Sequence, residues 1–240
     1  MTDPMTWQPP SPSARIFSGV EKIDRLLDSQ RRYAAMLDDG NDVFYSRSDI
    51  RMLIDKFRQG ARESLLSLYC EVHGINDIES AQSLILHAAA EFKLSHRNTR
   101  LLISEYGHLI NHSNPDGLYG SLPLHTAAAA TGADHLFRLE LFLNAYPDAV
   151  KIPDSNNMLP LQIAAIHGAD FDVIKLLIDA HPLALARPLF PRVITDDLEE
   201  LIGMLPFHIG CCRSYSLEVT FLILVEYPSC ILPREISFGA

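Results

Sequence analysis

The amino-acid sequence predicts an all-α protein: a helical-repeat solenoid of stacked helix-turn-helix units, with extra helices at its N-terminus. The motif Leu-Pro-Leu-His-Thr-Ala at 122–127 recurs at 159–164 and 205–210, with a weaker copy, Leu-Ile-Leu-His-Ala-Ala, at 84–89. An apolar triplet follows the His or Gln of each copy after 14 to 16 residues. Since the agreement extends over whole units, it indicates stacked repeats that bury one continuous core.

The spacing of the copies divides the chain. Their His or Gln residues are 38, 37 and 46 residues apart, which gives about four units, at 84–121, 122–158, 159–204 and 205–240. Residues 1–16 form a proline-rich, polar tail that we expect to be disordered. Residues 17–83 are expected to form N-terminal helices that cap the stack in an atypical way, because a terminal repeat has one face in water.

Helical periodicity predicts three helices in this N-terminal region. The first covers about 19–38, behind a capping box that begins at Ser18. We expect it to dock onto the solenoid, with a coiled coil as the alternative. The other two, at 49–59 and 62–73, end before Gly60 and Gly74 and form a helical pair.

Each later unit contains signals for two helices. Proline is tolerated at the first position of a helix, so Pro123, Pro160 and Pro206 mark the starts of short first helices. Gly132 and Gly168 then predict the turns. Second helices are expected at 136–146, 171–180 and 217–226, and the residues placed to cap second helices are Ser95, Asp170 and Ser216.

These residues resemble the ankyrin repeat family, whose signature is Thr-Pro-Leu-His-x-Ala before a glycine turn and a second helix. The resemblance covers residues 84–240, with leucine in place of the family threonine and a longer period. It implies that His87, His125, Gln162 and His208 bond backbone groups and tie neighbouring units together. It also implies a non-catalytic scaffold that binds a partner protein through a concave face and the inter-repeat loops. The residues expected there are Tyr119, Thr126, Asn156, Asn157, Met158, Ile163, His167 and Arg213.

The amino-acid composition narrows the class of partner and the cellular compartment that we expect. The formal charge of −10 disfavours nucleic acid and favours a protein partner with a basic patch. The longest wholly apolar cluster, 221–225, is too short to span a membrane, and the N-terminus has no secretory signal. Four cysteines are too sparse for a disulfide scaffold, so we expect mostly buried thiols and an intracellular protein, cytoplasmic or nuclear.

Two residue pairs have types that enzyme chemistry uses. His108 and His112 have the spacing of zinc ligands but run into a turn sequence. Cys211 and Cys212 replace alanines of earlier copies, which favours buried packing over a catalytic thiol. The segment 183–204 lengthens the third unit and is either a binding loop or a solvated filler. We expect no catalytic residue, metal or cofactor, while a regulatory segment of a larger enzyme and a cryptic metal-dependent hydrolase stay as alternatives.

Overall fold

The computed structural model describes residues 12–38, 47–76, 78, 80–114, 121–130, 132, 134–212 and 216–231. Every regular element in these ranges is a helix, as the all-α prediction requires. The α-helices are α1 (Pro12–Asp38), α2 (Arg47–His73), α3 (Ile85–Glu91), α4 (His96–Tyr106), α5 (Pro123–Ala129), α6 (His135–Ala145), α7 (Pro160–Ile166), α8 (Phe171–Ala180), α9 (Asp196–Glu199), α10 (Pro206–Cys212) and α11 (Leu217–Glu226). The 3₁₀ helices are η1 (Ser80–Leu84), η2 (Gly107–Leu109), η3 (Pro147–Lys151), η4 (Pro182–Ala186) and η5 (Pro228–Ile231). Within the described ranges, no helix has the length and apolar character that crossing a membrane requires.

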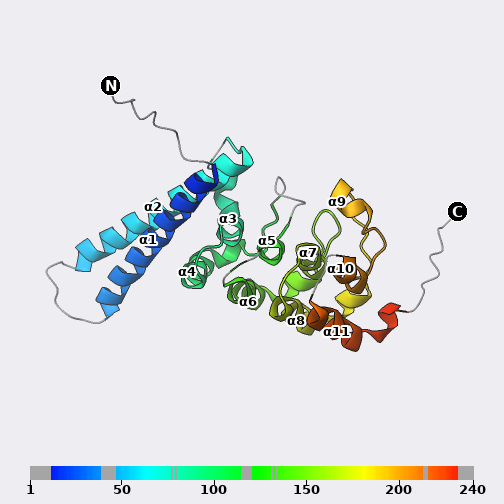
Figure 1. Ribbon diagram of the computed structural model, residues 1–240. Helices are drawn as coiled ribbons and strands as arrows, with labels where there is room; N and C mark the ends of the chain where they lie inside the picture. Colours follow the sequence, from blue (N-terminus) through cyan, green and yellow to red (C-terminus); the bar gives the residue numbers. More distant parts are fainter. Residues whose placement is uncertain are drawn as a thin grey trace, which may run out of the picture.

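The two N-terminal helices form a long hairpin. Helices α1 and α2 lie side by side and project away from the shorter helices (Figure 1). Each buries an apolar stripe, with Ile23 and Leu27 from α1 and Leu65 and Leu66 from α2 in the core. Their mutual packing explains why both helices persist for 27 residues.

This hairpin corrects three predictions. Helix α1 begins at Pro12, so the expected disorder is wrong for residues 12–16, and residues 1–11 lie outside the described part. Ser18 is inside the helix and therefore caps nothing. The two helices expected at 49–59 and 62–73 are one helix, because α2 continues through Gly60. A glycine inside a helix costs only about 1 kcal/mol, which packing along a long partner helix readily offsets.

The remaining α-helices, except α9, form two rows (Figure 1). Helices α3, α5, α7 and α10 contact one another in sequence, and α4, α6, α8 and α11 form the second row. The helices α5, α7 and α10 begin at the three predicted prolines, and α8 and α11 have the predicted bounds. Where Tyr-Pro or His-Pro follows a second helix, a 3₁₀ helix begins at the proline, since proline starts such a turn but cannot continue the preceding helix.

Capping at the second helices follows the prediction in part. The side chain of Ser95 accepts a hydrogen bond from the backbone N–H of Asn98 at 3.4 Å, and Ser216 caps α11 in the same way. Asp170 occupies the N-cap position of α8, but its side chain forms no capping bond. Gly168 has a φ of +69°, the left-handed conformation predicted for the turn.

Polar contacts join the hairpin to the rows. Oε1 of Glu105 in α4 accepts hydrogen bonds from Gln30 Nε2 at 2.6 Å and from Arg58 Nε at 3.0 Å. Asn98 Nδ2 donates to Asp24 Oδ1 at 2.7 Å. Because the buried apolar residues of the hairpin and of the rows belong to one cluster, α1 and α2 extend the same core. Helix α1 packs mainly on α2 and reaches the rows through α4, a narrower form of the docking that we expected.

Candidate functional site

In α3, α5 and α7 the third residue, a histidine or glutamine, fixes the connection between units. Nδ1 of His125 accepts a hydrogen bond from the backbone N–H of Leu122 at 3.1 Å. Its proton must therefore be on Nε2, which donates to the carbonyl of Ile152 at 2.9 Å, in the connection to the next unit. One side chain thus completes the start of its own helix and holds the next connection.

Gln162 makes the same two bonds with amide atoms. Its Oε1 accepts from the N–H of Leu159 at 2.9 Å, and its Nε2 donates to the carbonyl of Arg187 at 3.1 Å. In the weaker first copy, His87 Nε2 lies 2.7 Å from the carbonyl of Ser121. These bonds join α3, α5 and α7 to backbone groups of the connection to the next unit.

Burial keeps the tying histidines uncharged. It lowers the pKa values of His87 and His125 to about 4, although their bonds to backbone carbonyls favour the charged form. His208, the fourth of the set, is half-buried, and its ring lies 5.5 Å from that of Phe207. A neutral imidazole that bonds two backbone groups, as His125 does, suits a structural role better than proton transfer.

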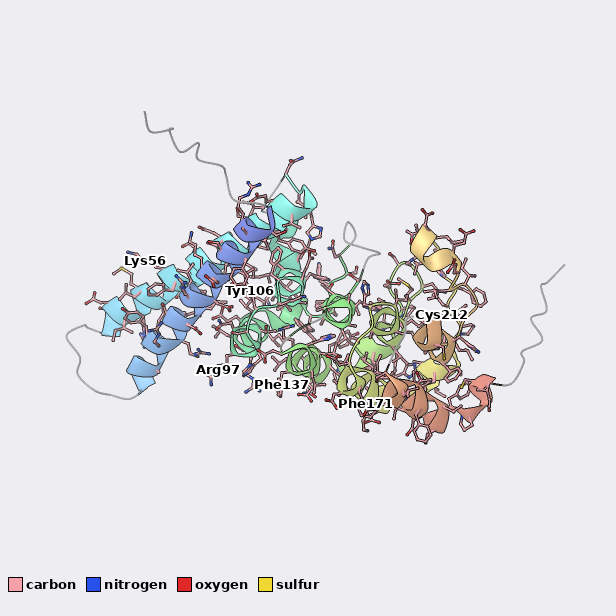
Figure 2. All side chains as sticks on the ribbon, viewed as in Figure 1. Lys56, Arg97, Tyr106, Phe137, Phe171 and Cys212 are labelled. Atoms are coloured by element: carbon pink, nitrogen blue, oxygen red, sulfur yellow. The ribbon has the colours of Figure 1, made fainter. Side chains whose placement is uncertain are left out.

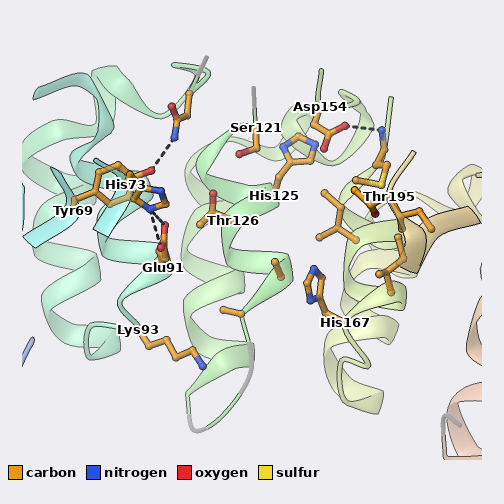
Figure 3. Close-up of a pocket in the computed structure, with 17 residues that line it drawn as sticks. Tyr69, His73, Glu91, Lys93, Ser121, His125, Thr126, Asp154, His167 and Thr195 are labelled. Carbon is orange, nitrogen blue, oxygen red and sulfur yellow. Dashed lines mark hydrogen bonds and ion pairs between the residues drawn. The ribbon is translucent and has the colours of Figure 1, made fainter. Parts of the chain in front are cut away.

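A groove with a cavity volume of about 410 Å³ crosses the first-helix row (Figure 3). Part of its lining comes from equivalent sequence positions of successive units, namely Glu91, Ala129 and Ile166. Its apolar lining comes from α5, α7, α9 and the preceding loops and consists of Ala129, Ala130, Met158, Ile163, Ile166 and Leu198. Small residues in α5 face larger ones in α7, and the hollow lies between them.

The N-terminal hairpin closes one end of this groove with polar groups. The hydroxyl of Tyr69 accepts a hydrogen bond from Asn114 Nδ2 at 2.8 Å, and burial raises the pKa of this phenol. His73 Nε2 lies 2.9 Å from both carboxylate oxygens of Glu91. Figure 3 shows Tyr69, His73 and Glu91 gathered beside the groove, with Lys93 further along the same side.

The other end combines the loop before α7 with the long insertion. Asp154 Oδ1 accepts a hydrogen bond from the N–H of Met158 at 2.7 Å, and burial raises the pKa of this carboxyl to about 6. Thr195 and Leu198 of the insertion line the groove beside it. The segment 183–204 therefore contributes to the candidate site and is more than a solvated filler.

The residues expected to bind a partner do not all lie in one place in the structure. Thr126, Met158, Ile163 and His167 line the groove together. Of these, His167 is exposed, Thr126 is half-buried, and the other two form part of the apolar lining. Two further expected residues, Tyr119 and Arg213, lie outside the described residues.

The side chains of Asn156 and Asn157 form hydrogen bonds to the insertion, residues 183–204. Asn156 is buried, and its amide bonds the backbone N–H and carbonyl of Val193. Asn157 donates to the carbonyl of Phe190 at 2.9 Å and accepts from the guanidinium of Arg187. These bonds engage one donor and the oxygen of each amide within the chain, and the partner-binding role expected for both residues stays a prediction.

Several groove residues were missed in the sequence. Glu91, Ala129 and Ile166 each follow the His or Gln of their unit by four residues, so the repeat register could have identified them. Tyr69 and Thr195 carry no such signal, because long-range packing of the hairpin and the insertion brings them to the groove.

The other chemistry-bearing residues lie apart from the groove. Cys211 and Cys212 are exposed, so the prediction of buried packing is wrong for both, whereas Cys70 and Cys230 are buried. Figure 2 labels Cys212, the residue that ends α10. Burial and the neighbouring Cys212 raise the pKa of the Cys211 thiol. His108 and His112 are exposed, and no three His, Cys, Asp or Glu residues of the described ranges gather as a metal site.

No family model and no curated protein matches this sequence. The candidate site is therefore defined by its own geometry, an apolar hollow with polar ends on the first-helix row.

Proposed function

We propose that this chain is an ankyrin-like solenoid that acts as a non-catalytic scaffold and binds a partner protein in the groove and along the inter-repeat loops. The observation that carries the proposal is the groove itself. Equivalent positions of consecutive units line it, and four of the eight residues expected from the family resemblance are among them. Rigid units that present variable side chains on one face are the usual binding device of repeat proteins.

The shape and chemistry of the groove suggest what the partner contributes. The cavity is large enough for one or two bulky apolar side chains, which would pack against Ile163, Ile166 and Leu198. The polar ends offer acceptors at Glu91 and Asp154 for the partner's donors. A partner segment with an apolar anchor beside a basic residue fits this arrangement and the formal charge of −10.

The chemistry of the described side chains supports a non-catalytic role. Both ring nitrogens of His125 bond backbone groups, so neither is left for a substrate proton. Partial burial of the Cys211 thiol and the neighbouring Cys212 raise its pKa, which weakens it as a nucleophile. The proposal includes the reducing cytoplasm or nucleus as the compartment, with the four cysteines as thiols.

Blocking the groove tests this function. Ala129→Phe places a ring in the hollow from the last residue of α5, whereas Asn144→Phe adds the same ring at an exposed position of α6. Partner capture from a lysate of the producing cells is compared for the wild type and both variants, with circular dichroism to check folding. We expect a protein that the wild type and Asn144→Phe retain and that folded Ala129→Phe loses.

Identical sets of retained proteins for all three chains would contradict the groove as the binding site. A retained protein whose association rate does not fall with rising salt would remove the basic-patch part of the proposal, because screening weakens only charge-driven encounter.

A further inference from the structure

Helix α11 departs from the other second helices on its outward face. Seven of its ten residues are apolar, yet only Val219 and Ile223 are buried. Leu217, Phe221 and Val225 are 87%, 67% and 55% exposed. Their spacing of four residues places them on one stripe of the helix. A helix that is apolar all round is ordinarily covered on every side.

The earlier units have polar residues at two of these three positions, those of Phe221 and Val225. Each second helix ends at, or is followed by, a Tyr or His. Six residues before that Tyr or His, the four helices hold Arg100, Glu140, Lys175 and Phe221. Two residues back, they hold Ser104, Asn144, Asp179 and Val225. Most of these side chains are exposed, so position in the fold does not account for the change. The apolar stripe belongs to α11 alone among the four helices.

The surface around the stripe is acidic. Helices α8 and α11, which contact each other, carry four carboxylates and one ammonium, namely Asp172, Asp179, Glu218, Glu226 and Lys175. The ammonium is already occupied, because Lys175 Nζ donates to Asp179 Oδ2 at 2.7 Å. An anionic lipid surface would be repelled by such a rim, and so would a second copy of this chain.

We infer that the outward face of α11 is a second docking site, which takes a basic amphipathic helix of a partner protein. The apolar side of that helix packs on Leu217, Phe221 and Val225, and its Lys or Arg residues meet Glu218 and Glu226. This is helix-to-helix recognition through anchors one turn apart, and it does not depend on the groove. With both sites occupied, the chain would hold two partners at once.

The test uses a labelled peptide of about 18 residues, with leucines at helical spacing and lysines on the flanks. Fluorescence anisotropy measures its binding to the full chain. Phe221→Gln with Val225→Gln removes the stripe, and Phe137→Gln is the matched control, because Phe137 is 55% exposed on α6. We expect the double variant to weaken binding about tenfold or more and the control to leave it unchanged. Glu218→Gln with Glu226→Gln should weaken binding severalfold and flatten its salt dependence.

A peptide in which glutamate replaces the lysines should bind at least tenfold more weakly. Equal binding of both peptides, or equal binding to wild type and the stripe variant, would overturn the proposal. Dimers of the peptide-free chain that the stripe variant abolishes, seen by sedimentation, would instead make a second copy the occupant. Binding to anionic vesicles that the stripe variant loses would make it a membrane. No binding of the basic peptide at about 100 μM would also refute the inference.

Discussion

The α1–α2 hairpin and the two rows of shorter helices are stabilised in different ways. Each hairpin helix has 27 residues and a partner along its length. The motif helices α5, α7 and α10 have seven residues each, which is too short for stability in isolation. They depend on close neighbours and on side chains such as His125 that hold two backbone groups. The stabilising contacts are spread along the whole length of the hairpin, whereas in the rows they are concentrated at a few residues of each unit.

The largest expected effect is in the core of the rows. Leu177 is fully buried in α8, so Leu177→Asp would bury an unpaired charge and should destabilise the fold by about 4 kcal/mol or more. Met52 in the hairpin is half exposed, and Met52→Asp should change stability by less than about 0.5 kcal/mol. Urea denaturation followed by circular dichroism compares them. Equal tolerance would show that α8 does not pack as described.

Acid should weaken the rows through their buried histidines. His87 and His125 have folded pKa values near 4, below the unfolded value of 6.5, so the unfolded chain binds protons first. Their stabilisation is complete above pH 6.5 and is lost as pH falls towards 4, by roughly 3 kcal/mol each. The raised pKa of Asp154 acts in the opposite direction below about pH 6.

His125→Gln should flatten this pH dependence without loss of stability at neutral pH, because Gln162 forms the equivalent pair of bonds in the next unit. Denaturant midpoints from pH 7.5 to 4.5 measure the effect. An unchanged slope in the variant would exclude His125 as a source of acid sensitivity.

A smaller effect is expected where the two regions meet. Glu105→Ala removes the acceptor of Gln30 and Arg58 and should cost about 1–2 kcal/mol. Hydrogen exchange should become faster in α1 and α2 and remain slow in α7 and α8, because the contact joins the hairpin to α4. Acceleration in all four helices would mean that the regions unfold as one unit.

The smallest effect contrasts two glycines. A Cβ at Gly60 in α2 meets no atom within 4 Å, so Gly60→Ala should stabilise the chain by about 0.5–1 kcal/mol. Gly168 also has open space but a φ of +69°, so Gly168→Ala should destabilise it by a similar amount. Thermal melts of the two variants should move in opposite directions. A shift of both in the same direction would contradict the assigned conformations.

The comparison also explains what the sequence could predict. Proline at the first helical position and the His or Gln after it act locally, so the starts of α5, α7 and α10 were predicted to the residue. The predicted helix boundaries in the hairpin are wrong at two residues. Ser18 is a local start signal and Gly60 a local stop signal, and long-range packing of α1 on α2 overrides both. Local signals decide where a short helix begins, and tertiary packing decides how far a long helix continues.

The residues of the candidate site also divide into those that a local pattern predicts and those that depend on long-range packing. Thr126, Ile163 and His167 repeat at fixed offsets from the motif, and the structure places all three in the groove. The roles of Asn156 and Asn157 depend on bonds to residues more than 30 positions away, which no periodic pattern contains. Groove residues supplied by the hairpin and the insertion were invisible for the same physical reason.

The central claim is that the groove binds a partner protein. Site-specific photo-cross-linking in the producing cells tests it most directly, with the photoreactive residue at position 129 in the groove or at position 144 on the outward face of α6. The account predicts a discrete adduct from position 129 and none of that mass from position 144. No adduct from position 129, or the same adduct from both positions, would contradict it.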